Sequence, residues 1–174
     1  MLIGIIGFFA SCEDGIEKVR LMSEEKNFPD QSMTNAEINH TTNGRLQVKI
    51  TAAEIKRYMR VDEPHTIFPE GLHVLFYDST MAVESSISAN YAIYHESDKM
   101  WEARNDVVTI NNEGDTLNTE YLVWDQNKEN IHTDRYVRIT TPDGIIHGKG
   151  FESNQDFSNW RIKETTGTIE VDNE

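Results

Sequence analysis

The sequence of 174 residues is poor in cysteine, in proline and in positive charge. It holds one cysteine, Cys12, and four prolines. One cysteine cannot form an intramolecular disulfide, so an oxidising and a reducing compartment suit the chain equally. Sixteen lysines and arginines stand against 30 aspartates and glutamates, which gives a formal net charge of −14. Such a surface repels nucleic acid and anionic membrane faces and favours solubility.

Motifs that carry catalysis are also missing. The six histidines are scattered, with no His-x-His or HExxH spacing that would indicate catalytic zinc. There is no GxSxG nucleophile elbow and no GxxxxGK phosphate loop. Acidic residues are plentiful, but none stands beside an apolar pocket that would tune its pKa. The sequence therefore predicts a protein that is not an enzyme and that needs neither a metal nor a cofactor.

Long apolar runs are absent except at the N-terminus. Residues 2–10 carry no charge and are followed by Cys12. As a helix this run would be about 14 Å long, too short to cross a bilayer. It resembles the apolar part of a secretory signal, although no basic segment precedes it. A cysteine at the cleavage point is typical of bacterial lipoproteins, so we expect residues 1–12 to be a signal segment ending at a lipidated Cys12. The alternative is a buried N-terminal strand with a free cysteine in the core.

The remaining chain divides into a tether and one domain of modest core. Residues 13–32 mix charges with sparse apolar positions, as a tether does. From residue 33 onward, short segments rich in Val, Ile, Thr, Tyr and Trp alternate with polar turn clusters at 42–44, 77–80, 96–99, 111–115, 125–130, 141–144, 153–156 and 165–167. This pattern predicts an all-β domain over residues 33–174. Residues 50–58 also fit a helical spacing, but the β-rich segment before them favours a strand.

An internal repeat indicates how these strands are arranged. Similar residues recur thirty positions apart, in the pairs Tyr91 and Tyr121, Tyr94 and Trp124, Trp101 and Ile131, Val107 and Val137, and Gly114 and Gly144. A fainter third copy follows at a spacing of 29. A hairpin-sized unit buries its apolar face only by stacking on its neighbours. We therefore expect a stack of antiparallel strands with a shared interior.

The alternation of apolar and polar residues indicates which side chains face that interior, because successive side chains of a strand point to opposite faces. The expected inward residues are Leu72, Val74, Phe76, Trp101, Ala103, Ile131, Val137, Ile139, Trp160 and Ile162. The pattern alone leaves two interpretations of this stripe: the core of an ordinary sandwich, or the lining of a ligand channel.

Three segments of the chain, residues 44–58, 87–144 and 146–171, resemble the LptC family, which belongs to the wider OstA-like superfamily. The resemblance rests on the start of a strand at 89–94, on the W-x-A-x-N-x-V motif at 101–107 and on the G-x-G-F motif at 148–151. It implies a twisted, open β-jellyroll built of stacked antiparallel strands, with an apolar groove inside. The ten inward residues are then the expected lining of the groove.

The resemblance also implies a function in lipopolysaccharide transport. The acyl chains of lipid A would slide along the groove at the periplasmic face of the inner membrane, while the sugars stay in water. The strands around residues 45–50 would dock on the jellyroll subunits of the inner-membrane ABC transporter, and residues 160–171 on the soluble periplasmic bridge protein. Many members of the family hold the membrane by an uncleaved helix, whereas a lipid on Cys12 is expected here. The competing interpretation is a lipid-anchored, carbohydrate- or protein-binding β-sandwich with a dry core.

Overall fold

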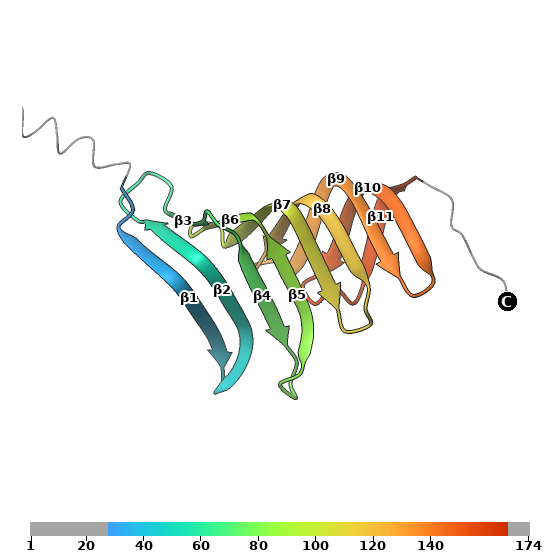
Figure 1. Ribbon diagram of the computed structural model, residues 1–174, viewed down its shortest axis with the longest axis horizontal. Helices are drawn as coiled ribbons and strands as arrows, with labels where there is room; N and C mark the ends of the chain where they lie inside the picture. Colours follow the sequence, from blue (N-terminus) through green and yellow to red (C-terminus); the bar gives the residue numbers. More distant parts are fainter. Residues whose placement is uncertain (1–27, 167–174) are drawn as a thin grey trace, which may run out of the picture.

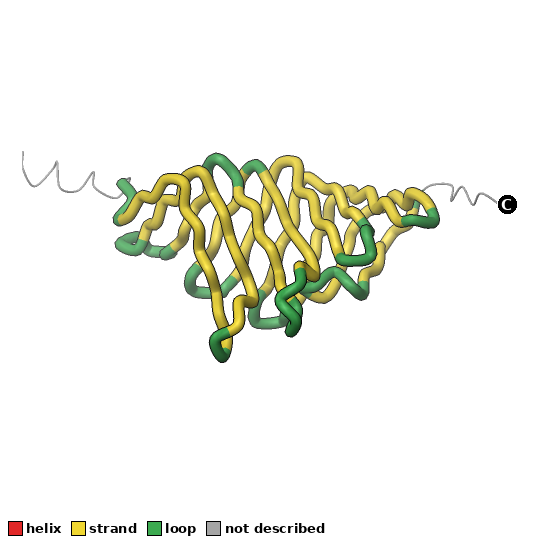
Figure 2. Tube along the Cα trace, turned by 60° about the horizontal axis from the view of Figure 1, so that its bottom comes forward, coloured by secondary structure: helices red, strands yellow, loops and turns green. Residues whose placement is uncertain are grey.

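The computed structural model describes residues 28–166, which form a single antiparallel sheet of eleven strands (Figure 1). The strands are β1 (Gln31–Thr42), β2 (Arg45–Tyr58), β3 (His65–Phe68), β4 (Leu72–Tyr77), β5 (Val83–Ala89), β6 (Tyr91–His95), β7 (Met100–Asn111), β8 (Thr116–Asp125), β9 (Asn130–Thr141), β10 (Gly144–Asn154) and β11 (Trp160–Thr165). Figure 2 shows that short loops join these strands, with no helix in the described range. The predicted all-β class is confirmed, as is the strand at 50–58. Cys12, the signal segment and most of the tether lie outside the described residues.

The sheet is rolled into two layers because two of its long strands change partners along their length. Residues 48–51 of β2 pair with β4, whereas residues 56–58 pair with β3. In the same way, residues 108–111 of β7 pair with β5, and residues 100–104 pair with β6. Since β3 also pairs with β6, one layer contains β4 and β5 and the other contains β3 and β6. The result is a jellyroll-like double layer.

Each strand, or pair of strands, that passes from one layer to the other is called a rung. The rungs bend along one line, which we call the fold line. Gly71 separates β3 from β4 and Asn90 separates β5 from β6, while Asn105 and Asp106 interrupt the pairing of β7 with positive φ angles of 64° and 53°. The backbone N–H of Asn90 donates to the carbonyl of Asn105 at 3.0 Å, so neighbouring bends lie side by side. Further along, Gly150 interrupts β10 with a φ of 74°. Bulges and glycines of this kind let a strand turn a corner.

The strand ends that lie away from the fold line are joined by turns. We call the opening between the two layers on this side the mouth. One layer ends in turns at 78–82, 112–115 and 142–143, and the other in turns at 59–64, 96–99, 126–129 and 155–159. The turns from 78 onward coincide or overlap with the clusters predicted between residues 77 and 156, whereas the turn at 59–64 was not predicted and the cluster at 165–167 begins at the last residue of β11. The thirty-residue spacing of the sequence corresponds to one hairpin, since Trp101 of β7 has its counterpart Ile131 in β9.

The two terminal strands lie at opposite ends of the molecule (Figure 1). Within the described residues, β1 pairs only with β2 and β11 only with β10. The strand β1 begins at Gln31, two residues before the predicted domain boundary, because Gln31 and Ser32 already pair with β2. The strand around residues 45–50, which was expected to dock on the transporter, is not a free edge of the sheet. Residues 48–50 pair with β1 on one side and β4 on the other, so the free edge belongs to β1.

The core lies between the two layers. It consists of apolar side chains contributed by strands from β2 to β10, together with Phe157 from the loop before β11. Within the described residues, no helix is long and apolar enough to cross a membrane.

Candidate functional site: an apolar slit closed at one end

All ten residues predicted to line a groove face the interior of the double layer. Seven of them are buried in the core: Leu72, Val74, Phe76, Ala103, Ile131, Val137 and Ile139. The other three, Trp101, Trp160 and Ile162, are partly buried and pack against the same core. The alternation read from the sequence therefore assigned these side chains to the correct face of the sheet.

The interior holds a narrow cavity between β2 and β8, which we call the slit. Its lining residues are Ile50, Leu72, Val74, Ile87, Ala92, Trp101, Glu102, Ala103, Leu122 and Trp124. Its free volume is about 20 Å³, and its exposed lining is apolar. That volume is enough for about one water molecule. An acyl chain can therefore enter only when side chains move aside.

The structure divides the predicted stripe into two parts. Leu72, Val74, Trp101 and Ala103 line the slit. The residues of β9 in the stripe do not. Ile131, Val137 and Ile139 are at most 1 % exposed and belong to a tightly packed region that also contains Leu117, Phe151 and Phe157. Sequence reasoning missed Ile50, Ile87, Ala92, Leu122 and Trp124 as lining residues.

Aromatic rings gather on one side of the slit. Trp101 of β7 is the register partner of Trp124 of β8, and their rings are stacked with centroids 6.1 Å apart. Tyr94 and Phe68 pack against Trp101 at 4.6 and 5.4 Å, and Phe76 meets Trp124 edge-on at 5.2 Å. Such contacts add stability beyond the burial of area alone. The cluster therefore holds both indoles in fixed positions beside the slit.

The loop of residues 155–159 closes the mouth near β11, and we call it the strap. The strap follows the layer that contains β3 and β6. It forms hydrogen bonds with the end of β7 and the turn between β7 and β8, which belong to the layer that contains β4 and β5. The Asn111 side-chain amide donates to the carbonyl of Phe157 at 3.2 Å, and the Trp160 indole N–H donates to the Asp115 carboxylate at 3.0 Å. The Phe157 ring is fully buried and meets Phe151 edge-on at 5.7 Å. The strap thus seals the packed region from the mouth.

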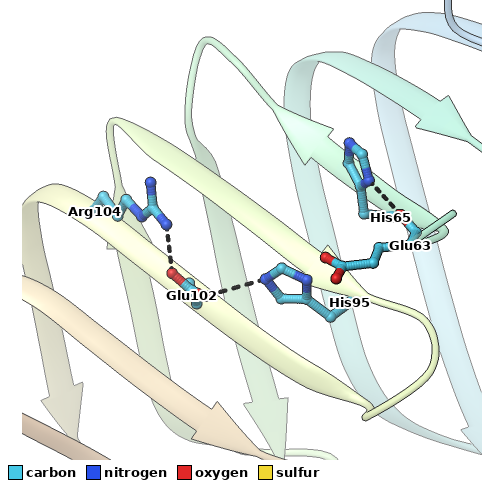
Figure 3. Close-up of polar contacts among 5 residues, drawn as sticks. All are labelled: Glu63, His65, His95, Glu102 and Arg104. Atoms are coloured by element: carbon cyan, nitrogen blue, oxygen red, sulfur yellow. Dashed lines mark hydrogen bonds and ion pairs between the residues drawn. The ribbon is translucent and has the colours of Figure 1, made fainter. Parts of the chain in front are cut away.

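A polar cluster centred on Glu102, which borders the slit, joins β6, β7 and β8 (Figure 3). The Glu102 carboxylate accepts a hydrogen bond from the Arg104 guanidinium at 2.6 Å and lies 3.0 Å from His95 Nε2. The Arg104 guanidinium in turn lies over the rings of Tyr91 and Tyr121. Burial raises the pKa of Glu102, but the hydrogen bonds from Arg104, Tyr121 and His95 and the charge of Arg104 outweigh it, so the pKa is below its usual value.

The same view places Glu63 and His65 beside this cluster. The ring nitrogen Nδ1 of His65 lies 2.7 Å from the backbone carbonyl of Glu63, which is a local contact within the loop before β3 and its first residue. Among residues 28–166, no three His, Cys, Asp or Glu side chains are grouped so that they could hold a metal ion. The contact of His95 with Glu102 joins β6 to β7.

The sequence was compared with models of known protein families to identify the family of this chain. The family model described as lipopolysaccharide-assembly, LptC-related, matches residues 1–170. The chain belongs to this family. The resemblance predicted from the sequence motifs is thereby confirmed. No curated protein matches the chain.

Membership of the LptC family makes the chain a component of lipopolysaccharide transport. The family is associated with the inner membrane, faces the periplasm and is not known for enzymatic activity. Two features of this chain bear on its part in that transport: the apolar slit, and the free edges of β1 and β11.

Proposed function

We propose that the chain is a periplasmic bridge component that receives lipopolysaccharide from the inner-membrane ABC transporter and passes it to the next jellyroll protein. The observation that carries this proposal is the slit, whose exposed lining is apolar and which lies between two layers of one rolled sheet. The acyl chains of lipid A occupy the interior after the slit has widened, and the sugars project through the mouth into water.

Affinity in this scheme comes from apolar burial. A net charge of −14 gives the surface no general attraction for the phosphates of lipid A. Burial of an acyl chain contributes about 0.8 kcal/mol for each methylene group, so a partly buried chain supplies enough attraction for reversible binding. Weak, repeated binding of this kind suits a carrier that must also release its cargo.

The free strand edges suit head-to-tail assembly. Every residue of β1 except Ala36 is exposed, and the outer edge of the strand has no partner among the described residues. At the opposite end, β11 offers its outer edge in the same way. A partner strand that adds to such an edge satisfies its backbone groups and extends the sheet. We assign β1 to the jellyroll subunits of the transporter and β11 to the soluble periplasmic bridge protein.

The membrane anchor in this proposal is a lipid on Cys12. It would hold the domain at the periplasmic face of the inner membrane through the tether. Replacement of Cys12 by serine should release the protein into the soluble periplasmic fraction. Retention of the Cys12→Ser variant in the membrane fraction would favour an uncleaved apolar segment instead.

The test of the proposed function is photo-crosslinking to purified lipopolysaccharide. A photoreactive amino acid is placed at Phe76 or Trp101, which face the interior, and in matched controls at Arg138, which is exposed on the outside. Crosslinked lipopolysaccharide at the two interior positions and none at Arg138 would support transport through the interior. A folded protein that gives no crosslink at either interior position would favour the dry-core β-sandwich that binds carbohydrate or protein.

A further inference from the structure

The strap crosses the mouth between the slit and the free edge of β11. The strap and the first residue of β11 are joined to the opposite layer by hydrogen bonds with Asn111 and Asp115. In the proposed function, the acyl chains lie in the interior while the sugars project through the mouth. A molecule held in this way cannot slide beneath a loop that joins the two layers. It can reach the β11 end only if the strap leaves the mouth.

The strap closes the mouth with one buried side chain, that of Phe157. The last three turns of this layer each contain a residue with a positive φ angle, 54° at Lys99, 52° at Glu129 and 59° at Phe157. Lys99 and Glu129 are charged and exposed, whereas the Phe157 ring is fully buried. A positive φ is unusual for a bulky residue, and such residues are concentrated in binding clamps and switch regions. The Phe157 ring is therefore a plug set into the mouth by a turn that is otherwise like its neighbours.

The shape of the strap is maintained by its own hydrogen bonds. The Asn154 side chain donates to the Ser158 hydroxyl at 2.8 Å and accepts a bond from the Asn159 backbone N–H at 2.8 Å. The Ser158 backbone N–H and hydroxyl donate to the Asp156 carboxylate at 2.9 and 2.7 Å. None of these bonds involves the opposite layer. The strap can therefore move away from that layer as one unit.

A like charge opposes the closed position of the strap. Burial, followed by the charges of Asp156 in the strap and of Asp78, raises the pKa of Glu84 on β5. Since β5 belongs to the opposite layer, the carboxylates of Asp156 and Glu84 repel each other across the mouth. The plug and the two hydrogen bonds hold the strap closed against this repulsion.

We propose that the strap is a gate at the β11 end of the interior, with Phe157 as its plug. While the gate is closed, acyl chains are confined to the slit. When the lipid advances, the Phe157 ring leaves the core and the strap swings away from the opposite layer. This inference rests on the proposed function, because it assumes that acyl chains occupy the interior. It adds a step at which the cargo is held before it reaches the edge of β11.

The test follows the Phe157 ring directly by fluorine NMR of the full-length protein. Phe157 is replaced by para-fluorophenylalanine, which has nearly the shape of phenylalanine. Without lipid, its chemical shift should be the same in ordinary and heavy water, because the ring is buried. Purified lipopolysaccharide at saturation should produce a second resonance whose shift differs between the two solvents.

The matched control carries the same label at Phe68. This ring is also buried, but it lies 5.4 Å from the Trp101 ring beside the slit and far from the strap in the sequence. Its resonance should move when lipid fills the slit and should stay insensitive to the solvent. A response at Phe68 with Phe157 still buried would overturn the gate and leave the proposed function intact. No response at Phe68 would overturn the proposed function, and the gate with it.

A second experiment locks the strap. In a Cys12→Ser background, Asn159→Cys in the strap and Glu113→Cys in the turn between β7 and β8, both at exposed positions, are joined by a cleavable bis-maleimide. A photoreactive amino acid at Ile162, on the inner face of β11, should crosslink to lipopolysaccharide only after the link is cleaved. The same amino acid at Trp101 should crosslink in both states.

The control for the lock joins Lys99→Cys to Glu129→Cys, two turns of the same layer, and should leave the crosslink at Ile162 intact. Equal crosslinking at Ile162 in the locked and cleaved proteins would overturn the gate, because chains would then pass a closed strap. Loss of crosslinking at both Ile162 and Trp101 in the locked protein would also contradict it, since a gate at the β11 end leaves the slit accessible.

Discussion

Truncation of Phe157 to alanine tests whether the strap belongs to the folded core. The ring is fully buried and packs between Phe151 at 5.7 Å and Trp160 at 6.5 Å. Removal of a buried phenylalanine side chain typically costs about 3–5 kcal/mol of unfolding free energy. Because the strap is a loop and can partly collapse into the space, we expect a loss near the lower limit, about 3 kcal/mol. A domain of ordinary stability, about 5–15 kcal/mol, would remain folded after this loss.

The measurement is equilibrium unfolding in urea, followed by tryptophan fluorescence and by circular dichroism. With a typical slope of about 1–3 kcal/mol per molar urea, the midpoint should fall by about 1–3 M. The matched control is Asn159→Ala in the same loop, where the side chain is exposed and the expected change is within about 0.5 kcal/mol. A loss below about 1 kcal/mol for Phe157→Ala would refute the conclusion that the strap seals the packed region.

Three other substitutions test the remaining features. Trp101→Asp introduces a charge beside the slit and should abolish lipopolysaccharide delivery to the outer membrane in a domain that still shows strand-type circular dichroism, whereas Arg138→Asp on the outside should not. Gly148→Ala should loosen β11 and cost about 1–3 kcal/mol, because a methyl group there collides with the side chain and backbone of that strand; Lys149→Ala, which is exposed, should change the urea midpoint little. The lowered pKa of Glu102 contributes stability above the pKa of the unfolded state, and this contribution is lost as the pH falls through the folded pKa. Between about pH 5 and pH 3 the wild type should therefore lose more stability than Glu102→Gln, and equal losses would contradict the role of the polar cluster.

The sequence was most informative where structure depends on near neighbours. Strict alternation placed Leu72, Val74 and Phe76 on the inner face, because side chains of a strand alternate whatever the strand pairs with. The polar clusters predicted the turns for the same reason, since a turn is specified by a few consecutive residues.

Features that depend on distant pairing could not be predicted in this way. Leu122, Val123 and Trp124 are all buried, so the C-terminal part of β8 shows no alternation from which Trp124 could be assigned to the slit. Phe157 follows the polar cluster at 153–156, and its ring is buried because it packs against Phe151 and Trp160, while the Asn111 amide, 46 positions earlier in the chain, donates to its backbone carbonyl.

The sequence did not show that β1 covers the strand around residues 45–50, which was expected to dock on the transporter. Residues 31–42 are polar and almost entirely exposed, so nothing in their pattern marks them as the strand that covers β2. Only the pairing itself, from Gln31 with Arg57 to Thr42 with Arg45, shows that β1 forms the edge.

Because the sheet is built of repeated hairpins, its length from β1 to β11 can change only by whole hairpins. If β3 with β4 and β5 with β6 are each counted as one rung bent at the fold line, the described residues form nine rungs. At a separation of about 4.8 Å between neighbouring strands, they span about 40 Å from β1 to β11. Duplication of one thirty-residue hairpin would add two rungs, or about 10 Å, without changing either edge strand or the cross-section of the interior. The distance that such a domain spans is therefore set by the number of its hairpins, independently of the partners at its two ends.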